Sequence, residues 1–441
     1  MITTRIMKAA PRLHCLCRIA TLMFALLALS VFASAQQFTV LHNFSGGGDG
    51  AYPYAGVTLD AAGGLYGTTT QGGVSGACNG CGTIYKLAHR GSGWVLTTLY
   101  TFHGQDGANP QSRVTFGPGG ALFGTTDSGG QLYGTVFKLQ PPSSICPSVA
   151  CAWSLTTLHS FTNDPDGARP AAADLAFDSA GNIYGATNTG GNTGFVCADD
   201  EPCGAVYKMT RSGNTWTESV VYNFQGESDG AFPNGVTLDS AGNLFGTTIF
   251  RGDQVEGTVF VLTPNGHGGF TEESLYSFSG GLDGAEPWGT AILDGSGGYF
   301  GTTSWGGSGN GGTVWHLHSS GGNWTLDTLA SFSYSGQLDV PPPGSTAALT
   351  MDAAGNLYGT TRLDGAFSQG SVFKLTHSGS GWTLTTLHDF TGAADGGQPF
   401  GQVSIDANGN LFGTASIGGN TVGTPSCYRG LGCGVVWEIA Q

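Results

Sequence analysis

Eight cysteines are the residues whose type and spacing most directly suggest chemistry. They fall in four close pairs: Cys78 with Cys81, Cys146 with Cys151, Cys197 with Cys203, and Cys427 with Cys433. The first pair has the CxxC spacing of redox and zinc motifs. A structural zinc needs four ligands, however, and neither a second CxxC nor a paired histidine lies near it. Because an even number of cysteines in an exported chain indicates disulfides, we predict four bridges, each pinning a long loop in one shape.

Arg113 and Asp174 are the charged residues that could serve catalysis, and they occupy equivalent places in neighbouring repeats. We expect them to pair with each other. The sequence has no GxSxG, P-loop or HExxH motif, and the repeats do not place two carboxylates together for acid–base work. His42, His159 and His388 share one repeat position, but equivalent outer positions of a ring lie too far apart to share a metal. We therefore predict no catalytic residue, no metal and no cofactor.

Aromatic side chains at variable positions indicate a binding surface. Trp288 and Trp305 depart from the repeat pattern and come from two loops of one repeat, so we expect a single aromatic platform flanked by Asp283 and Asn310. Aromatic faces beside amides and carboxylates suit sugar rings or extended peptides. The predicted ligand-binding residues are Tyr54, Trp288, Trp305, Phe400, Asp283, Arg113 and Asp174.

An Asp-Gly dipeptide recurs between repeats, and it predicts turns. Its aspartates are Asp49, Asp106, Asp166, Asp229, Asp283 and Asp395. A calcium site takes six to eight oxygen ligands, whereas each loop offers one dependable carboxylate, so we predict turn capping. The sixth repeat has instead a proline-rich loop from Leu338 to Pro343. A partner contact and a relaxed repeat both remain open for it.

These residues are positioned by a tandem repeat whose core is the string LYGTT. Its seven copies begin at Leu65, Leu122, Ile183, Leu244, Tyr299, Leu357 and Leu411. The spacing between the copies, from 54 to 61 residues, suits a four-stranded propeller blade. Each unit holds four short runs of strand composition separated by Gly, Asp, Asn and Ser. Aromatic residues recur in the fourth run of each unit, and we expect the glycine in each core to leave room for their rings.

The two ends of the chain complete one blade. The seventh unit stops after its third strand, while the N-terminal side begins with an unpaired fourth strand at residues 38–44. Pairing these strands closes the ring and removes its open edges. We therefore predict an all-β fold, a single closed seven-bladed β-propeller with four antiparallel strands per blade. Its repeats span approximately residues 45–102, 103–161, 162–224, 225–278, 279–332, 333–390 and 391–441.

The Leu-Tyr-Gly-Thr-Thr and Gly-Thr-Val-Phe-Lys-Leu cores resemble the GloVer tandem repeat of exported bacterial proteins. The resemblance covers essentially all of residues 36–441, and it implies a repeat architecture without an assigned activity. Members of that family commonly carry a C-terminal surface-anchoring tail. This sequence ends directly after its last predicted strand, so we expect a form without a covalent anchor.

The N-terminal segment indicates the cellular compartment of the protein, and the composition limits the classes of partner. Residues 1–35 place four basic residues before an apolar stretch, Ile19 to Ala33, that ends in a small-x-small cleavage site, which predicts a signal peptide. The stretch is too short for a membrane span. The 77 Gly have no strict collagen period, and 11% of the residues are aromatic, so collagen and disorder are excluded. Its net charge of −15, near −19 without the signal peptide, disfavours nucleic acid and anionic lipid.

Three hypotheses follow for a secreted or periplasmic monomer. The leading one is a non-enzymatic propeller that binds a glycan or another envelope component through its variable loop face. The second is a propeller hydrolase or lyase acting on a polysaccharide or a lactone, with Arg113, Asp174 and the repeated Asp-Gly aspartates as its candidates. The third is a structural or protein-interaction module with an envelope protein as partner.

Overall fold

The computed structural model describes residues 36–441 apart from 74–77, 79, 92, 143–151, 171–173, 192–193, 195, 199–200, 214, 268, 335–343, 345–346, 380, 421–426 and 428–429. The predicted signal peptide, the Cys146–Cys151 pair and the proline-rich loop at 338–343 lie outside the described residues. Within them the regular structure is β-strand, with one short 3-10 helix, η1 (Pro118–Gly120).

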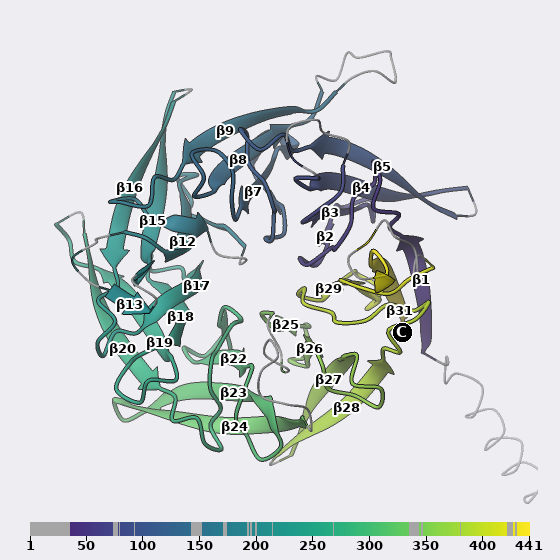
Figure 1. The fold of residues 1–441 in the computed structure, drawn as a ribbon. Coiled ribbons are helices and arrows are strands. Elements are labelled where there is room, and N and C mark those ends of the chain that lie inside the picture. The colour runs from purple at the N-terminus through teal and green to yellow at the C-terminus, as the bar shows by residue number, and fades with distance from the viewer. Residues whose placement is uncertain are drawn as a thin grey trace, which may run out of the picture.

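Seven antiparallel sheets are arranged as blades around a central axis, and in every blade except the fourth the innermost strand is the shortest (Figure 1). The first blade contains β2 (Thr58–Leu59), β3 (Leu65–Thr69), β4 (Thr83–Arg90) and β5 (Gly93–Thr101). The second contains β6 (Thr115–Phe116), β7 (Leu122–Thr126), β8 (Thr135–Gln140) and β9 (Ser154–Ser160). The third contains β11 (Ala176–Phe177), β12 (Ile183–Thr189), β15 (Ala205–Ser212) and β16 (Thr215–Asn223), with β10 (Ala168–Pro170) also on β12.

The remaining blades repeat this order. The fourth contains β17 (Ala231–Leu238), β18 (Leu244–Phe250), β19 (Thr258–Pro264) and β20 (Phe270–Ser277). The fifth contains β21 (Ile292–Leu293), β22 (Tyr299–Thr303), β23 (Asn310–Ser320) and β24 (Asn323–Ser333). The sixth contains β25 (Thr350–Met351), β26 (Leu357–Thr361), β27 (Ser371–Ser378) and β28 (Gly381–Asp389). A separate ribbon joins β13 (Val196–Ala198) to β14 (Glu201–Pro202).

The seventh blade joins the two ends of the chain. It contains β29 (Ser404–Ile405), β30 (Leu411–Ala415), β31 (Val435–Ala440) and, outermost, β1 (Gln37–Asn43). Strand β1 runs antiparallel to β31, with Phe38 opposite Ile439 and Asn43 opposite Val435 (Figure 1). The predicted all-β, seven-bladed propeller and its closure by the N-terminal strand are confirmed.

Recurring aromatic side chains fill the space within and between the blades. The phenylalanines that end each outer strand are almost fully buried: Phe44, Phe102, Phe161, Phe224, Phe278, Phe332 and Phe390. The glycine of each LYGTT core faces a ring from the third strand of its own blade, not from the fourth as the sequence suggests. A Cβ on Gly124, for example, would lie 2.7 Å from Cζ of Phe137. This close approach explains why the core strand keeps a glycine at its centre.

Hydroxyl groups of Thr and Ser side chains connect neighbouring blades. On the inner strands, Thr58 donates to the Val114 carbonyl at 2.6 Å and Thr237 donates to the Ala291 carbonyl at 2.9 Å. Across the closure, Ser404 donates to the carbonyl of Val57. These bonds satisfy hydroxyl groups that are partly or fully buried, and they help to hold the ring together.

Candidate functional site

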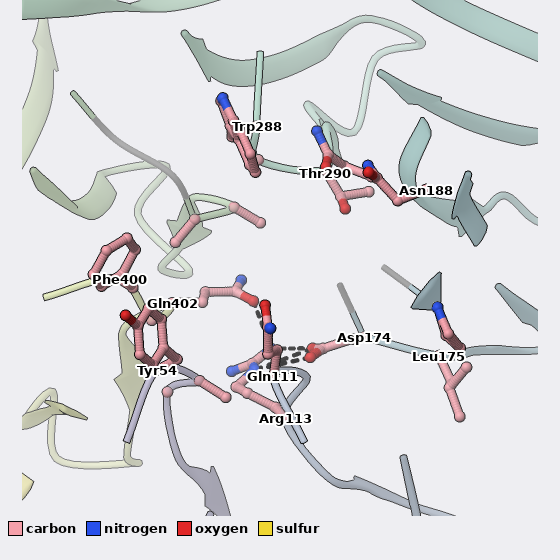
Figure 2. Close-up of a pocket in the computed structure, with 18 of the residues that line it drawn as sticks. Tyr54, Gln111, Arg113, Asp174, Leu175, Asn188, Trp288, Thr290, Phe400 and Gln402 are labelled. Atoms are coloured by element: carbon pink, nitrogen blue, oxygen red, sulfur yellow. Dashed lines mark hydrogen bonds and ion pairs between the residues drawn. The ribbon is translucent and has the colours of Figure 1, made fainter. Parts of the chain in front are cut away.

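A cavity of about 660 Å³ lies at the centre of the ring (Figure 2). Its lining comes from three repeat positions: the loop that enters each blade, the start of the inner strand, and the residue that follows the LYGTT core. Five of the seven predicted ligand-binding residues line it together, namely Tyr54, Trp288, Phe400, Arg113 and Asp174. The structure thus gathers residues from five blades at one place.

Tyr54 and Phe400 form an aromatic wall on one side of this cavity (Figure 2). Their ring centroids are 4.5 Å apart and their planes are tilted by 34°. Trp288 lies apart from them and its indole nitrogen is 3.3 Å from Glu286 Oε2. All three rings are half-buried, so each keeps a surface that a ligand can contact.

The loops that carry these rings share an unusual backbone conformation. In six of them a non-glycine residue just before a proline has a left-handed φ between 51° and 60°: Tyr52, Asn109, Arg169, Phe232, Glu286 and Gln398. Each of these residues donates its backbone N–H to a carbonyl of the neighbouring blade, as Tyr52 does to Cys433 at 2.9 Å. A non-glycine residue persists in this region only when its surroundings hold it there. The entering loops are therefore fixed from the adjacent blade.

Three disulfides reinforce that connection. Cys78 is joined to Cys81, Cys197 to Cys203, and Cys427 to Cys433, which are the predicted pairs that fall within the described residues. The second cysteine of each pair supplies the carbonyl that accepts the bond from the next loop; the donors are Asn109, Phe232 and Tyr52. Because Gln111, Asn234 and Tyr54 follow two residues later and line the cavity, the bridges support its rim.

Arg113 and Asp174 form the ion pair that the sequence predicts. Nε of Arg113 lies 3.1 Å from each carboxylate oxygen of Asp174, and Nη2 also contacts that carboxylate. The same guanidinium donates to Gln402 Oε1 at 2.5 Å and to Ser404 Oγ at 3.2 Å. One arginine thus connects blades two, three and seven at the cavity (Figure 2). Its position is determined by protein contacts alone.

Arg362 is a charged residue of the cavity that was not among the predicted ligand-binding residues. It follows β26, is only 8% exposed, and lines the cavity with its guanidinium carbon 4.5 Å from the Phe400 ring centroid. Nη2 donates to Gln398 Oε1 at 3.2 Å, whereas Nε and Nη1 are buried and have no hydrogen-bond partner among the described residues. Burial lowers the pKa of Arg362, yet arginine stays protonated at neutral pH.

Asp127 and Asn188, like Arg362, were not among the predicted ligand-binding residues. All three directly follow a LYGTT core and line the cavity. The available signal was the variety at this position, which reads Thr70, Asp127, Asn188, Ile249, Ser304, Arg362 and Ser416. Burial raises the pKa of Asp127, although the charge of Arg169 lowers it in part. A variable residue beside an invariant motif therefore indicates the site.

Trp305 and Asp283 have contacts outside this cavity lining, so the structure does not support the single platform expected for Trp288 and Trp305. The Trp305 ring lies edge-on to Tyr334 with centroids 5.9 Å apart. Asp283 accepts from the Ser279 backbone at 2.8 Å and from the Tyr276 hydroxyl at 3.0 Å. The two loops are hydrogen-bonded to each other, with the Ala285 N–H donating to the Trp305 carbonyl at 2.9 Å, yet the Trp305 ring packs on Tyr334 while Trp288 lines the cavity.

The repeated aspartates cap their own loops, as predicted. Asp166 accepts from the Thr162 backbone at 3.0 Å and lies 2.8 Å from His159 Nε2. His42 and His388 contact Asp49 and Asp395 in the same way, while Tyr100, Tyr222 and Tyr276 contact Asp106, Asp229 and Asp283. The recurring histidine or tyrosine is thus the partner of the loop carboxylate. The sequence shows the pairing as a spacing of six or seven residues.

The chain belongs to the family described as the Gloeobacter/Verrucomicrobia repeat, whose model matches residues 29–196, 151–341 and 268–428. The resemblance seen in the LYGTT cores is therefore confirmed. No curated protein matches the chain.

Three solved structures resemble the fold. A fungal alcohol oxidase of the AA5 family has a TM-score of 0.54 at 12% identity, covering 92% of this chain and 76% of that one. A puromycin hydrolase has a TM-score of 0.51 at 12% identity, covering 83% and 50%. A candidate 6-phosphogluconolactonase from Bacteroides uniformis has a TM-score of 0.45 at 15% identity, covering 77% and 86%. At these identities the likeness concerns the fold alone.

The three bridges are compatible with an extracellular protein. In the part of the chain that the structure describes, no helix has the length and apolar character needed to cross a membrane.

Proposed function

We propose that this protein is an exported, non-enzymatic propeller that binds a glycan of the cell envelope in the central cavity. The observation that carries the proposal is the combination of an aromatic wall, Tyr54 with Phe400, and polar side chains on other sides of one cavity (Figure 2). The apolar face of a sugar packs on aromatic rings, while its hydroxyl groups require hydrogen-bond partners. The cavity offers both.

Two further features support binding to this surface. The Thr290 hydroxyl lines the cavity, is buried and has no hydrogen-bond partner in the described part of the chain, so a ligand hydroxyl would satisfy it. The entering loops are held by the neighbouring blades and by disulfides, which limits the conformational entropy lost on binding. A preformed site of this kind suits a ligand with few strong contacts.

The test is a glycan array followed by titration calorimetry, using the protein purified after export with its disulfides oxidised. Tyr54→Ala and Trp288→Ala are expected to weaken binding of the best glycan about tenfold or more. Trp305→Ala is the matched control, because that tryptophan has its ring contact outside the cavity lining. Unchanged affinity in both cavity variants, with intact folding by circular dichroism, would overturn the proposal.

One observation favours the alternative of a polysaccharide hydrolase or lyase. Asp127 lies in the same cavity and burial raises the pKa of its carboxyl, as a general acid requires. Asp174, in contrast, is already engaged by Arg113. Release of reducing ends or unsaturated products that Asp127→Asn abolishes would establish an enzyme. Binding without product release would favour the non-enzymatic binding protein over the enzyme.

A further inference from the structure

Arg362 lacks the counter-charge that other arginines of the cavity possess. Arg113 pairs with Asp174, and Arg169 lies 3.8 Å from Glu201. Among the residues that the structure describes, Arg362 has no carboxylate partner, and its one hydrogen bond goes to the neutral amide of Gln398. It is nevertheless the more deeply buried residue, because Arg169 is exposed.

A buried cation of this kind is unfavourable unless something compensates it. Stacking on Phe400 offsets part of the cost, since the negative face of an aromatic ring attracts a guanidinium. Tyr54 does not supply the missing charge, because burial raises the pKa of its hydroxyl group and keeps it neutral. Among the described residues, Nε and Nη1 therefore remain without an acceptor.

We propose that a carboxylate on the bound glycan supplies this partner, so that the cavity selects glycans containing uronic acid. The inference rests on the proposed function and names its ligand class. A pyranose that packs on Tyr54 and Phe400 carries its carboxyl group one bond from the ring, close to the guanidinium that stacks on Phe400. Arginine binds carboxylates through strong charge-assisted hydrogen bonds.

The charges around the cavity favour a singly charged group. Three arginines line it, Arg113, Arg169 and Arg362, together with two aspartates, Asp127 and Asp174. Arg113 is paired with Asp174, and Arg169 has Asp127 and Glu201 near it, so Arg362 is the lining arginine without a carboxylate partner among the described residues. One uronate carboxylate matches this single cation, whereas a dianionic phosphate monoester would also be repelled by Asp127 and Asp174.

The experiment compares uronate oligosaccharides with their neutral counterparts. Tetramers of galacturonate, glucuronate and mannuronate, each beside its carboxyl-reduced form, are titrated into the oxidised, exported protein at low salt. We expect at least one uronate to bind about tenfold more tightly than its reduced form. Arg362→Gln should bring that ratio to about one, and Arg362→Lys should retain part of the preference.

Arg211→Gln is the control, because Arg211 is exposed near the end of β15 and donates to the Gly213 carbonyl. It should leave the ratio unchanged. Equal affinity for both members of every pair would overturn the inference while the proposed function stands. Preference for sulfated over uronate oligosaccharides would also overturn it. Absence of binding by all sugars would overturn the proposed function and this inference with it.

Discussion

The capped loops at the outer ends of the blades and the central cavity use similar side chains in opposite ways. In the loops each aspartate is held within its own blade, as Asp166 is by His159 and Thr162. In the cavity the polar groups come from different blades, and Arg362 and Thr290 keep atoms without partners among the described residues. The recurring aspartates stabilise the scaffold, whereas these variable cavity residues keep polar atoms that a ligand can contact.

The largest effect is expected where the scaffold is most tightly packed. Gly124→Ala places a Cβ 2.7 Å from the buried Phe137 ring, which has no room to move. Overpacking of this kind should destabilise the protein by about 3 kcal/mol. Thermal and denaturant unfolding measure it. Gly93→Ala is the control, because a Cβ there meets no atom within 4 Å and should change stability little.

Removing a capping aspartate should destabilise the protein less than substituting the packed glycine, but more than removing a surface ion pair. Asp166→Ala removes the acceptor of Thr162 and the partner of His159, and should cost about 2 kcal/mol without changing glycan affinity. The exposed pair of His318 with Asp327 provides the comparison, and Asp327→Ala should cost well under 1 kcal/mol. Equal losses from Asp166→Ala and Asp327→Ala in urea unfolding would contradict the distinction.

Protonation of a turn aspartate should also make the stability of the protein depend on pH. Burial by itself would raise the pKa of Asp294. Hydrogen bonds from His316, Ser296 and Gly298 outweigh this effect and lower the pKa to about 2 from an ordinary value of 3.8. A lowered pKa in the folded state stabilises the protein above the unfolded value, and the effect is lost as pH falls from about 4 to 2.

Asp294→Asn should therefore cost about 1 kcal/mol at pH 7 and nothing near pH 2. Urea unfolding of both proteins between pH 2 and 7 measures the difference. A difference that stays constant over this range would show that the carboxylate charge is not responsible.

The smallest expected change has the opposite sign. Arg362→Met replaces an uncompensated buried cation with an apolar side chain that still packs on Phe400. Stability should rise by about 1 kcal/mol while binding of an acidic glycan falls, because binding groups are commonly kept at a cost to stability. Calorimetric unfolding without ligand is the measurement. A loss of stability would indicate that Arg362 belongs to the scaffold.

The repeat allowed most of the scaffold to be predicted from the sequence, and little of the site. Recurring or closely spaced residues indicate three parts of the scaffold: the LYGTT spacing, the closing strand β1 and the cysteine pairs. Arg362 occurs once, and its importance depends on Phe400 from the next blade, which a single repeat does not reveal. Trp305 shows the converse error, because belonging to one blade does not place two tryptophans at one cavity.

The most direct test of the central claim is a crystal structure of the oxidised protein with the glycan that binds best. The account predicts a sugar ring against Tyr54 and Phe400, within reach of Arg113, Asp174 and Thr290. A sugar located instead at the peripheral pocket beside His316, His377 and Trp382, with the central cavity empty, would contradict it.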